Sequence, residues 1–508
     1  MLIDLNHLPS DPEFLQRLVR DMAATVESRD GEIERLQSII RKLQRMQFGR
    51  RSERLDGDQF ELALEDLDGD IARVQEAAPV VIADRDARPK RNPLPDHLPC
   101  EDRVLDVDHA ACACCGGDLH RVGESVSEML DWIPAQLRVI RTVRPKYACR
   151  TCEKIVQHAA PERVIAGGLA TPALLSHVLV SKYCDHTPLY RQSQIFARHG
   201  VDLARSTLAG WVGGACWWLE TLHDRLARNV FASDHLFADD TPVPVLDPGR
   251  GRTKTGRLWV YARDQRGWSG PQPSAAVYLF APDRKAERPA SHLQHFKGVL
   301  HVDGYAGFER LAGKGDVVLA ACWAHTRRKF YDVAQATGSP IAQDALRRIS
   351  ALYTIEAEVR GRSPPHRLLA RRQRSKPVVA ELRAWLETQL AQVSGRSTLA
   401  EAIRYALARW QGLTRFLHDG RIELDTNPVE RAIRPVALGR KNHLFAGSDG
   451  GGERWAVLCS LIESCKFNDV EPYAYLADVL QRMVDGHPIN RLDELLPWAW
   501  KERNPVKI

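Results

Sequence analysis

The sequence predicts a multidomain α/β protein in which helical segments and a zinc ribbon precede a domain of short strands and helices. The chain has 508 residues, more than one hydrophobic core usually accommodates. Hydrophobic residues make up 44% and charged residues 27%, which is typical of soluble globular proteins and excludes wholly disordered and membrane-embedded classes. No apolar run reaches the ~18 residues of a spanning helix. The acidic N-terminus lacks the basic and apolar blocks of a secretory signal, so we expect a cytoplasmic protein without a membrane partner.

The first organised segment, residues 1–55, has the heptad spacing of a coiled coil. β-branched residues recur at one heptad position and mainly Leu at the other, which favours a parallel two-stranded coil and hence a homodimer or larger assembly. A single amphipathic helix packed on its own domain is the alternative. The two sets are Val19, Val26, Ile33 and Ile40, and Leu15, Met22, Leu36 and Leu43.

Two Cys-x-x-Cys pairs follow the acidic and Pro-rich linker of residues 56–99. Cys112 with Cys115, and Cys149 with Cys152, supply the four thiolates of a tetrahedral structural zinc site. Cys114 leaves the ligand pair in the first knuckle open. We therefore predict a zinc ribbon over residues 100–160, with no open position for catalysis on this zinc. A cluster of ordinary buried thiols is the alternative.

Residues 161–230 are predicted to be helical, with a helix-turn-helix pattern in LYRQSQIFARHG, VDLA and RSTLAGWV. Leu208, Trp211 and Val212 share the apolar face of the second helix, which leaves Arg205 and Thr207 as candidates for contact with DNA in the major groove. Ser206 is the predicted N-cap of that helix. A helical hairpin that does not bind DNA has the same pattern.

From residue 231 onward, short apolar strands alternate with polar segments, and two of them carry acids. Asp239 lies in the first strand, HLFADDTPVPVL, and Asp303 lies in the fourth, GVLHVDGYAGF. A buried carboxylate is costly unless it is paired or binds a metal. Asp240 would point to the opposite face of its strand from Asp239. Carboxylates that converge in one sheet would bind Mg²⁺ or Mn²⁺, although two strand-end aspartates can also be mere caps.

A third acid, Glu430, follows Asn427-Pro428 at a predicted helix start after a helical region at 332–425. Arginines and a lysine surround it, as expected of a site that binds metal through carboxylates and DNA phosphates through cations. An exposed helix with ordinary charge pairs is the simpler alternative. The Gly450–Gly452 run does not match a phosphate loop and predicts a flexible turn.

These motifs, in this order, resemble transposases of the insertion sequence 66 family over nearly the whole chain. The matching segments are FGRRSERL (48–55), LPDHLP, the Cys-x-x-Cys pairs, ADDTPV (238–243), HVDGYAGF (301–308), CWAHTRRKF (322–330) and NPVERAIRPVALGRKNHLFAGSDGG (427–451).

The resemblance implies a ribonuclease H-like catalytic domain in which Asp239, Asp303 and Glu430 bind two Mg²⁺ or Mn²⁺ ions, in a bacterial, nucleoid-associated protein. The implied activity is cleavage of DNA at terminal inverted repeats and joining of the freed ends to double-stranded target DNA. Small accessory proteins of the same element are further expected partners. The alternatives are a catalytically silent DNA-binding repressor, and a ribonuclease H-like nuclease that cuts without joining.

The basic residues beside the acids are the remaining candidates for DNA contact. They are His325, Arg327, Arg328 and Lys329 after the fifth strand, and Arg431, Arg434, Arg440 and Lys441 on the Glu430 helix. The expected organisation is a coiled coil (1–55), a linker (56–99), a zinc ribbon (100–160), a helical DNA-binding segment (161–230), a catalytic core in two parts (231–331 and 426–458), a helical insertion (332–425) and a helical tail (459–508).

Overall fold

The computed structural model describes residues 161–504, with gaps at 248–252, 313–314 and 444, together with short pieces between 137 and 157. All of them belong to the second of two units, Asn92–Ile508. The predicted coiled coil, the linker and the zinc ligands Cys112, Cys115, Cys149 and Cys152 lie outside the described residues. On either side of the second cysteine pair in the sequence, β1 (Lys146–Ala148) pairs antiparallel with β2 (Ile155–Gln157).

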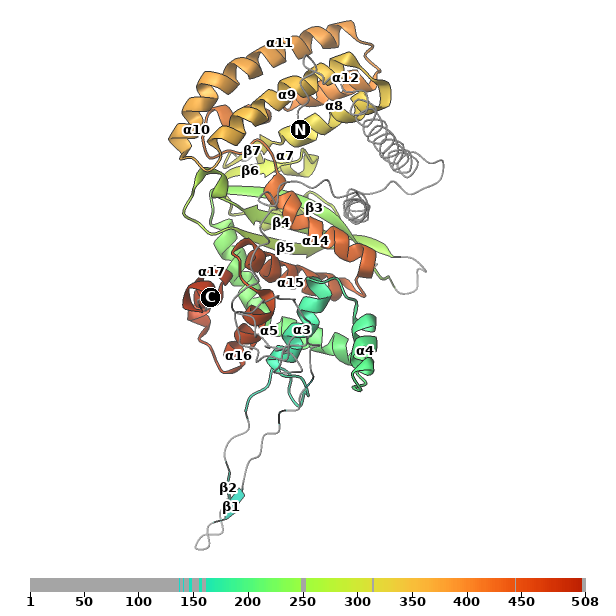
Figure 1. The fold of residues 1–508 in the computed structure, drawn as a ribbon, viewed down its shortest axis with the longest axis vertical. Helices are drawn as coiled ribbons and strands as arrows, with labels where there is room; N and C mark the ends of the chain where they lie inside the picture. Colours follow the sequence, from blue (N-terminus) through green and yellow to red (C-terminus); the bar gives the residue numbers. More distant parts are fainter. Residues whose placement is uncertain are drawn as a thin grey trace, which may run out of the picture. The chain divides into compact units, whose positions relative to one another are not determined.

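A five-stranded mixed sheet is the centre of the described fold (Figure 1). Its order is β5-β4-β3-β6-β7. Strands β3, β4 and β5 are antiparallel neighbours, β6 pairs in parallel with β3, and β7 pairs in parallel with β6. The predicted mixed α/β class is confirmed. The strands are β3 (His235–Val245), β4 (Lys254–Arg263), β5 (Ala275–Ala281), β6 (Gly298–Val302) and β7 (Val317–Ala321).

Pro242 and Pro244 are tolerated in β3 because the strand is central for only part of its length. Its pairing with β6 covers residues 235–238, whereas its pairing with β4 continues to Val245. After residue 238, β3 pairs with another strand of the sheet on its β4 side only. Proline, which has no backbone N–H, can occur in a strand at such an edge.

Helices before and after the sheet share one hydrophobic core with it. Helix α15 covers the edge strand β5, and its Ser460 and Ser464 hydroxyls bond the outer backbone groups of Tyr278 and Ala276. An open edge that would otherwise pair with another chain is thereby closed. The helices are α3 (Pro172–Tyr183), α4 (Leu189–Arg198), α5 (Arg205–Phe231), α6 (Glu287–His292), α7 (Ala306–Ala312), α14 (Asn427–His443), α15 (Asp449–Phe467), α16 (Pro472–Val484) and α17 (Pro497–Arg503), with short 3₁₀ turns η2 (Arg266–Trp268) and η5 (Ile489–Leu495).

A second core lies in the helical insertion after β7, in the yellow and orange part of Figure 1. Its buried centre includes Trp323, Phe330 and Leu382. The elements are α8 (Trp323–Thr337), α9 (Pro340–Val359), α10 (Pro364–Ala370), the π-helical turn η3 (Arg371–Ser375), α11 (Lys376–Gln392), α12 (Thr398–Ala408), α13 (Trp410–Leu413) and the 3₁₀ turn η4 (Arg415–Leu417).

Two local predictions were wrong. Helix α5 begins at Arg205 with Ala204 as its N-cap, so Ser206 lies inside the first turn. The run Gly450–Gly452 is the first turn of α15, capped by Ser448, and not a flexible turn. A Cβ at Gly452 would lie 2.5 Å from the Phe280 ring, so glycine here permits close packing of helix on strand.

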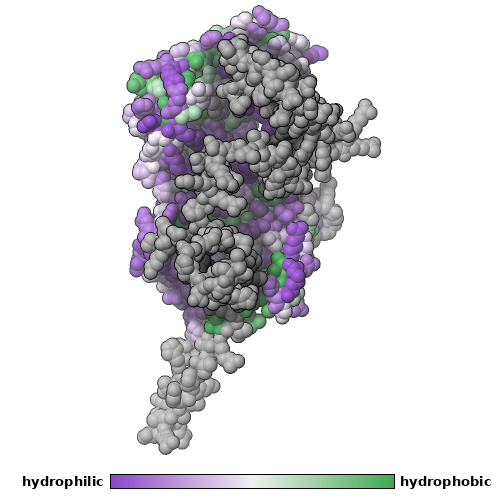
Figure 2. Space-filling model, viewed as in Figure 1, coloured by the Kyte–Doolittle hydropathy of each residue, from purple (hydrophilic) through white to green (hydrophobic). Residues whose placement is uncertain are grey.

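The described surface on the face in Figure 2 is mainly hydrophilic, with hydrophobic residues in small separate areas. Among the described helices, none is long and apolar enough to cross a membrane.

His292 gives the fold a predicted dependence on pH. Its Nδ1 lies 2.9 Å from the Tyr261 hydroxyl, and burial, followed by the charge of Arg288, lowers the pKa of His292 to about 4. The unfolded chain binds a proton here below pH ~6.5, whereas the folded chain does not until about pH 4. Stability from this residue is therefore present above pH ~6.5 and is lost as the pH falls toward 4.

We expect the free energy of unfolding to fall by about 1–2 kcal/mol at this residue between pH 7 and pH 5. Urea denaturation of the wild type and of His292→Gln at both pH values measures the difference. An equal pH dependence in the two proteins would contradict the prediction.

Candidate active site

Asp239 and Asp303 approach each other at the centre of the sheet. Asp239 lies within β3, and Asp303 follows the last residue of β6, the fourth strand of the sheet in chain order. Strands β3 and β6 are adjacent and parallel, with Ala238 opposite Val302, so Asp239 and Asp303 are the next residues along the two chains. Burial, then repulsion from Asp303, raises the pKa of Asp239 to about 7. The pair therefore carries excess negative potential, which a cation would relieve.

Asp240 is held away from this pair by two arginines. Its buried carboxylate accepts hydrogen bonds from Arg257 at 3.0 Å and from Arg284 at 2.9 Å. The alternation of the strand thus gives the two neighbouring acids different partners, since Asp239 interacts with Asp303 and Asp240 with arginines. Arg284, which sequence reasoning missed, also stacks 4.3 Å from the centre of the Tyr305 ring.

Glu430 approaches from α14, a helix that packs against β3 and β4. The Glu430 Oε1 accepts a 2.8 Å hydrogen bond from the Thr426 hydroxyl and lies 3.8 Å from His325 Nδ1. His325 in turn interacts electrostatically with Asp239, so it lies between the first and third acids. His325 thereby connects Glu430 to the Asp239–Asp303 pair.

Cys322, His325 and Glu430 bring one potential ligand atom each within 4.8 Å of one another. Cys322 is buried at the N-cap of α8, and burial raises the pKa of its thiol to about 11. The His325 Nδ1 is buried and lacks a hydrogen-bond partner among the described residues. It is thus available to a group that enters the site, such as a phosphate oxygen.

The donor set fits a hard divalent cation. Asp239, Asp303 and Glu430 offer carboxylate oxygens, the ligands that Mg²⁺ and Mn²⁺ prefer. Sequence reasoning also missed Asp425, whose pKa is raised to about 6 by burial, then by Glu423 and Glu430. Its position two residues before the Asn427-Pro428 helix start was the available signal.

The predicted DNA-contacting residues divide into two groups. Around the acids, Arg327, Arg328 and Lys329 are exposed on α8, and Arg431 and Arg434 are exposed on α14. Arg440 is partly buried and donates to the Pro242 carbonyl at 2.6 Å, while the buried Lys441 Nζ has no hydrogen-bond partner in the described part of the chain.

The second group lies on a different helix. Arg205 and Thr207 are exposed on the first turn of α5, while Leu208, Trp211 and Val212 are buried as predicted. Helix α4 precedes them and packs against α5, giving two successive packed helices.

Comparison with known proteins identifies the family. The model of the transposase IS66 family matches residues 167–454, and that of the zinc-finger binding domain of transposase IS66 matches residues 110–153. The IS66 C-terminal element matches residues 460–498, and a model described as transposase C of IS166 homeodomain matches residues 35–103.

Full-length relatives occur in Sinorhizobium fredii (strain NBRC 101917 / NGR234). The uncharacterized protein y4jD is 46% identical, covering 97% of each chain, and the uncharacterized protein y4qI is 40% identical, covering 99% of each. The family suggests DNA as the partner, divalent metal in the catalytic domain and zinc in the zinc-finger domain. The resemblance found in the motifs is confirmed, and the chain belongs to the IS66 family of transposases.

Proposed function

We propose that this protein is a DDE transposase with a ribonuclease H-like catalytic domain, in which Asp239, Asp303 and Glu430 bind two Mg²⁺ or Mn²⁺ ions. It cuts DNA at the terminal inverted repeats of its element and joins the freed ends to target DNA. The observation that carries the proposal is the approach of Asp239 on β3 to Asp303 after β6, on a sheet of order β5-β4-β3-β6-β7. Glu430 on α14 is linked to this pair through His325.

When bound, the ions would lower the pKa of the attacking water or hydroxyl and stabilise the leaving oxygen. The chain's own residues orient the reactants. Thr426 fixes the Glu430 carboxylate. The His325 Nδ1, which makes no hydrogen bond to the described residues, would donate to a phosphate oxygen of the bound strand. The exposed arginines of α8 and α14 would neutralise neighbouring phosphates.

The remaining parts would assemble the complex on DNA. The zinc ribbon of Cys112, Cys115, Cys149 and Cys152 and the α4–α5 pair would recognise the terminal repeats. The N-terminal coiled coil would pair two subunits, one for each end of the element. Small accessory proteins of the element and association with the bacterial nucleoid belong to this proposal.

The direct test supplies purified full-length protein with duplex DNA that ends in the element's terminal repeats, a supercoiled target and Mg²⁺. Strand cleavage at the repeat ends followed by joined products supports the proposal. Repeat binding without nicking would instead indicate a DNA-binding repressor, and cleavage without joining would indicate a nuclease.

The α4–α5 pair yields a prediction about binding alone. Arg205→Ala should weaken the affinity for terminal-repeat DNA by about 1–3 kcal/mol if Arg205 reads a base, with loss of discrimination at that base. Arg228→Ala is the matched control, because Arg228 is exposed on the same helix about 35 Å away along its axis. Titrations of labelled repeat DNA at fixed salt measure both. Equal affinities for the Arg205→Ala and Arg228→Ala proteins would remove α5 from the DNA interface.

A further inference from the structure

The turn that follows Asp303 is held from outside the sheet by helix α12 of the insertion. The Tyr405 hydroxyl donates a 2.9 Å hydrogen bond to the Asp303 carbonyl oxygen. The Arg409 Nη2 donates a 3.2 Å hydrogen bond to the carbonyl oxygen of the next residue, Gly304. Two successive carbonyls therefore have donors from a segment about 100 residues further along the chain.

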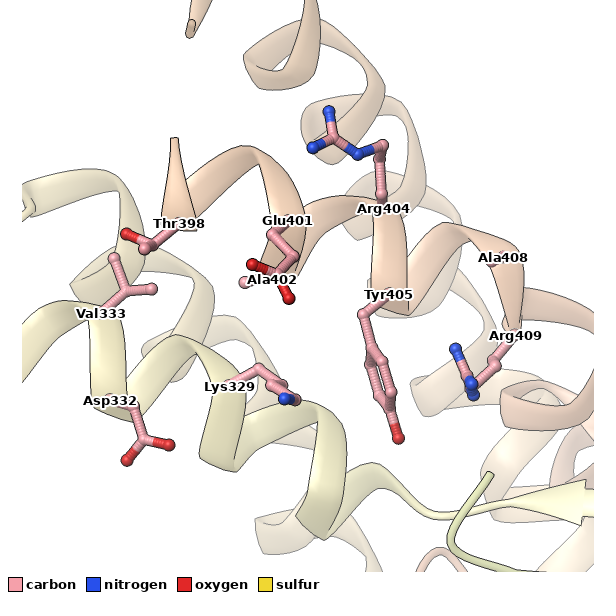
Figure 3. Close-up of a pocket in the computed structure, with 10 residues that line it drawn as sticks. All are labelled: Lys329, Asp332, Val333, Thr398, Glu401, Ala402, Arg404, Tyr405, Ala408 and Arg409. Atoms are coloured by element: carbon pink, nitrogen blue, oxygen red, sulfur yellow. The ribbon is translucent and has the colours of Figure 1, made fainter. Parts of the chain in front are cut away.

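The two donors support each other. The Arg409 guanidinium lies 4.1 Å from the centre of the Tyr405 ring, and the Lys329 ammonium lies 5.6 Å from the same centre. A cation over an aromatic face restrains both groups. Figure 3 shows Tyr405 on α12, Arg409 just after the end of that helix and Lys329 on α8. These residues line an open pocket of about 420 Å³.

The close approach of Arg409 requires glycine at position 304. Its φ of +101° is in the left-handed region that side chains disfavour, and a Cβ at this position would lie 2.5 Å from Arg409 Nε. The turn is also fixed from inside, since the Asp303 Oδ1 accepts the backbone N–H of Tyr305 at 2.9 Å. The backbone and one carboxylate oxygen of Asp303 thus have defined positions.

We propose that Tyr405 and Arg409 are positioning residues for Asp303, through which the helical insertion sets the orientation of this carboxylate toward the divalent ion. The inference rests on the proposed function, because it assigns Asp303 as a metal ligand. The insertion is then part of the catalytic apparatus. Groups that orient a ligating carboxylate typically change metal affinity or activity by about 10- to 100-fold when removed.

Tyr405→Phe is the sharpest variant because it removes one hydroxyl and keeps the ring under Arg409. We expect the Mg²⁺ concentration for half-maximal end cleavage to rise roughly tenfold, with cleavage largely restored at saturating Mg²⁺. Affinity for repeat DNA and the thermal midpoint should stay at wild-type values. Arg409→Ala should raise the Mg²⁺ requirement in the same way, and Arg409→Lys should partly restore it.

Binding of Mn²⁺ to the protein without DNA, followed by electron paramagnetic resonance, gives a readout separate from activity. The Tyr405→Phe protein should bind Mn²⁺ more weakly by a similar factor. Tyr473→Phe is the matched control, because Tyr473 is exposed on α16. An unchanged Mg²⁺ requirement and Mn²⁺ affinity in Tyr405→Phe would overturn the inference.

Asp303→Asn distinguishes a failure of the proposed function from a failure of the positioning role alone. If Asp303→Asn cleaves as well as the wild type, the proposed function itself is wrong. If Asp303→Asn is inactive while Tyr405→Phe and Arg409→Ala keep the wild-type Mg²⁺ requirement, the proposed function stands and only the positioning role is lost.

Discussion

Asp303→Asn and Asp239→Asn should each lower the rates of end cleavage and strand transfer by at least about a thousandfold. On the proposed function each substitution removes a carboxylate that binds the metal, and the transition state then loses roughly 4 kcal/mol of stabilisation. Asparagine keeps the shape of the side chain, and at position 303 its amide oxygen can still accept the Tyr305 N–H. The loss is therefore one of charge and metal binding, and binding of repeat DNA should persist.

Single-turnover cleavage with pre-bound DNA ends measures the effect. Asp316→Asn is the matched control, since Asp316 is an exposed acid beside β7 that pairs with Lys297 at 3.4 Å. It should cleave at the wild-type rate. Strand transfer retained by either Asp303→Asn or Asp303→Ala would disprove the assignment of the site.

The largest stability effect is expected in the helical insertion, at Arg371. Its fully buried guanidinium donates to both Glu356 carboxylate oxygens, at 2.6 and 2.7 Å, and to the carbonyls of Phe416 and Asp419, at 3.1 and 3.0 Å. Arg367 joins the same Glu356 to Glu423, seven residues before Glu430. A network of buried ion pairs thus connects the π-helical turn η3 with the segment that precedes α14.

Arg371→Met should destabilise the protein by about 3–5 kcal/mol. It leaves Glu356 with one cationic partner and removes a donor from the Phe416 and Asp419 carbonyls, of which the second keeps the Ile422 N–H. Urea denaturation at pH 7 measures the loss. Arg374→Met is the control within the same turn, because its pairing with Glu358 is exposed, and it should change the free energy of unfolding little. Equal stability of the Arg371→Met and wild-type proteins would contradict this account of the network.

The same network should also respond to acid. Burial alone would raise the pKa of Glu356, but Arg371 and Arg367 lower it below the ordinary value for glutamate. A lowered pKa in the folded state contributes stability above the ordinary pKa and loses it as the pH falls below about 4.5. The difference between wild type and Arg371→Met should therefore shrink in acid.

Local signals in the sequence were sufficient for the family and for the five strands. Strand composition and spacing identified each strand, and the order of short motifs identified the IS66 family without three-dimensional information. Helix periodicity separated the buried Leu208, Trp211 and Val212 from the exposed Arg205 and Thr207, because a regular helix assigns faces by spacing alone. The assignments of Asp239, Asp303 and Glu430 stay predictions until the variants are assayed.

Contacts between distant segments required the tertiary structure. Nothing near Tyr405 or Arg409 in the sequence indicates contact with the Asp303–Gly304 turn, because hydrogen bonds over about 100 residues leave no local pattern. The Gly450–Gly452 run suggests a turn by composition, and only the packing of Gly452 on Phe280 explains a helix there. The sequence by itself determined the family, the strands and the candidate acids, since these depend on residue type and spacing. The tertiary structure decided which charges meet, since burial and pairing depend on how the sheet and the insertion pack together.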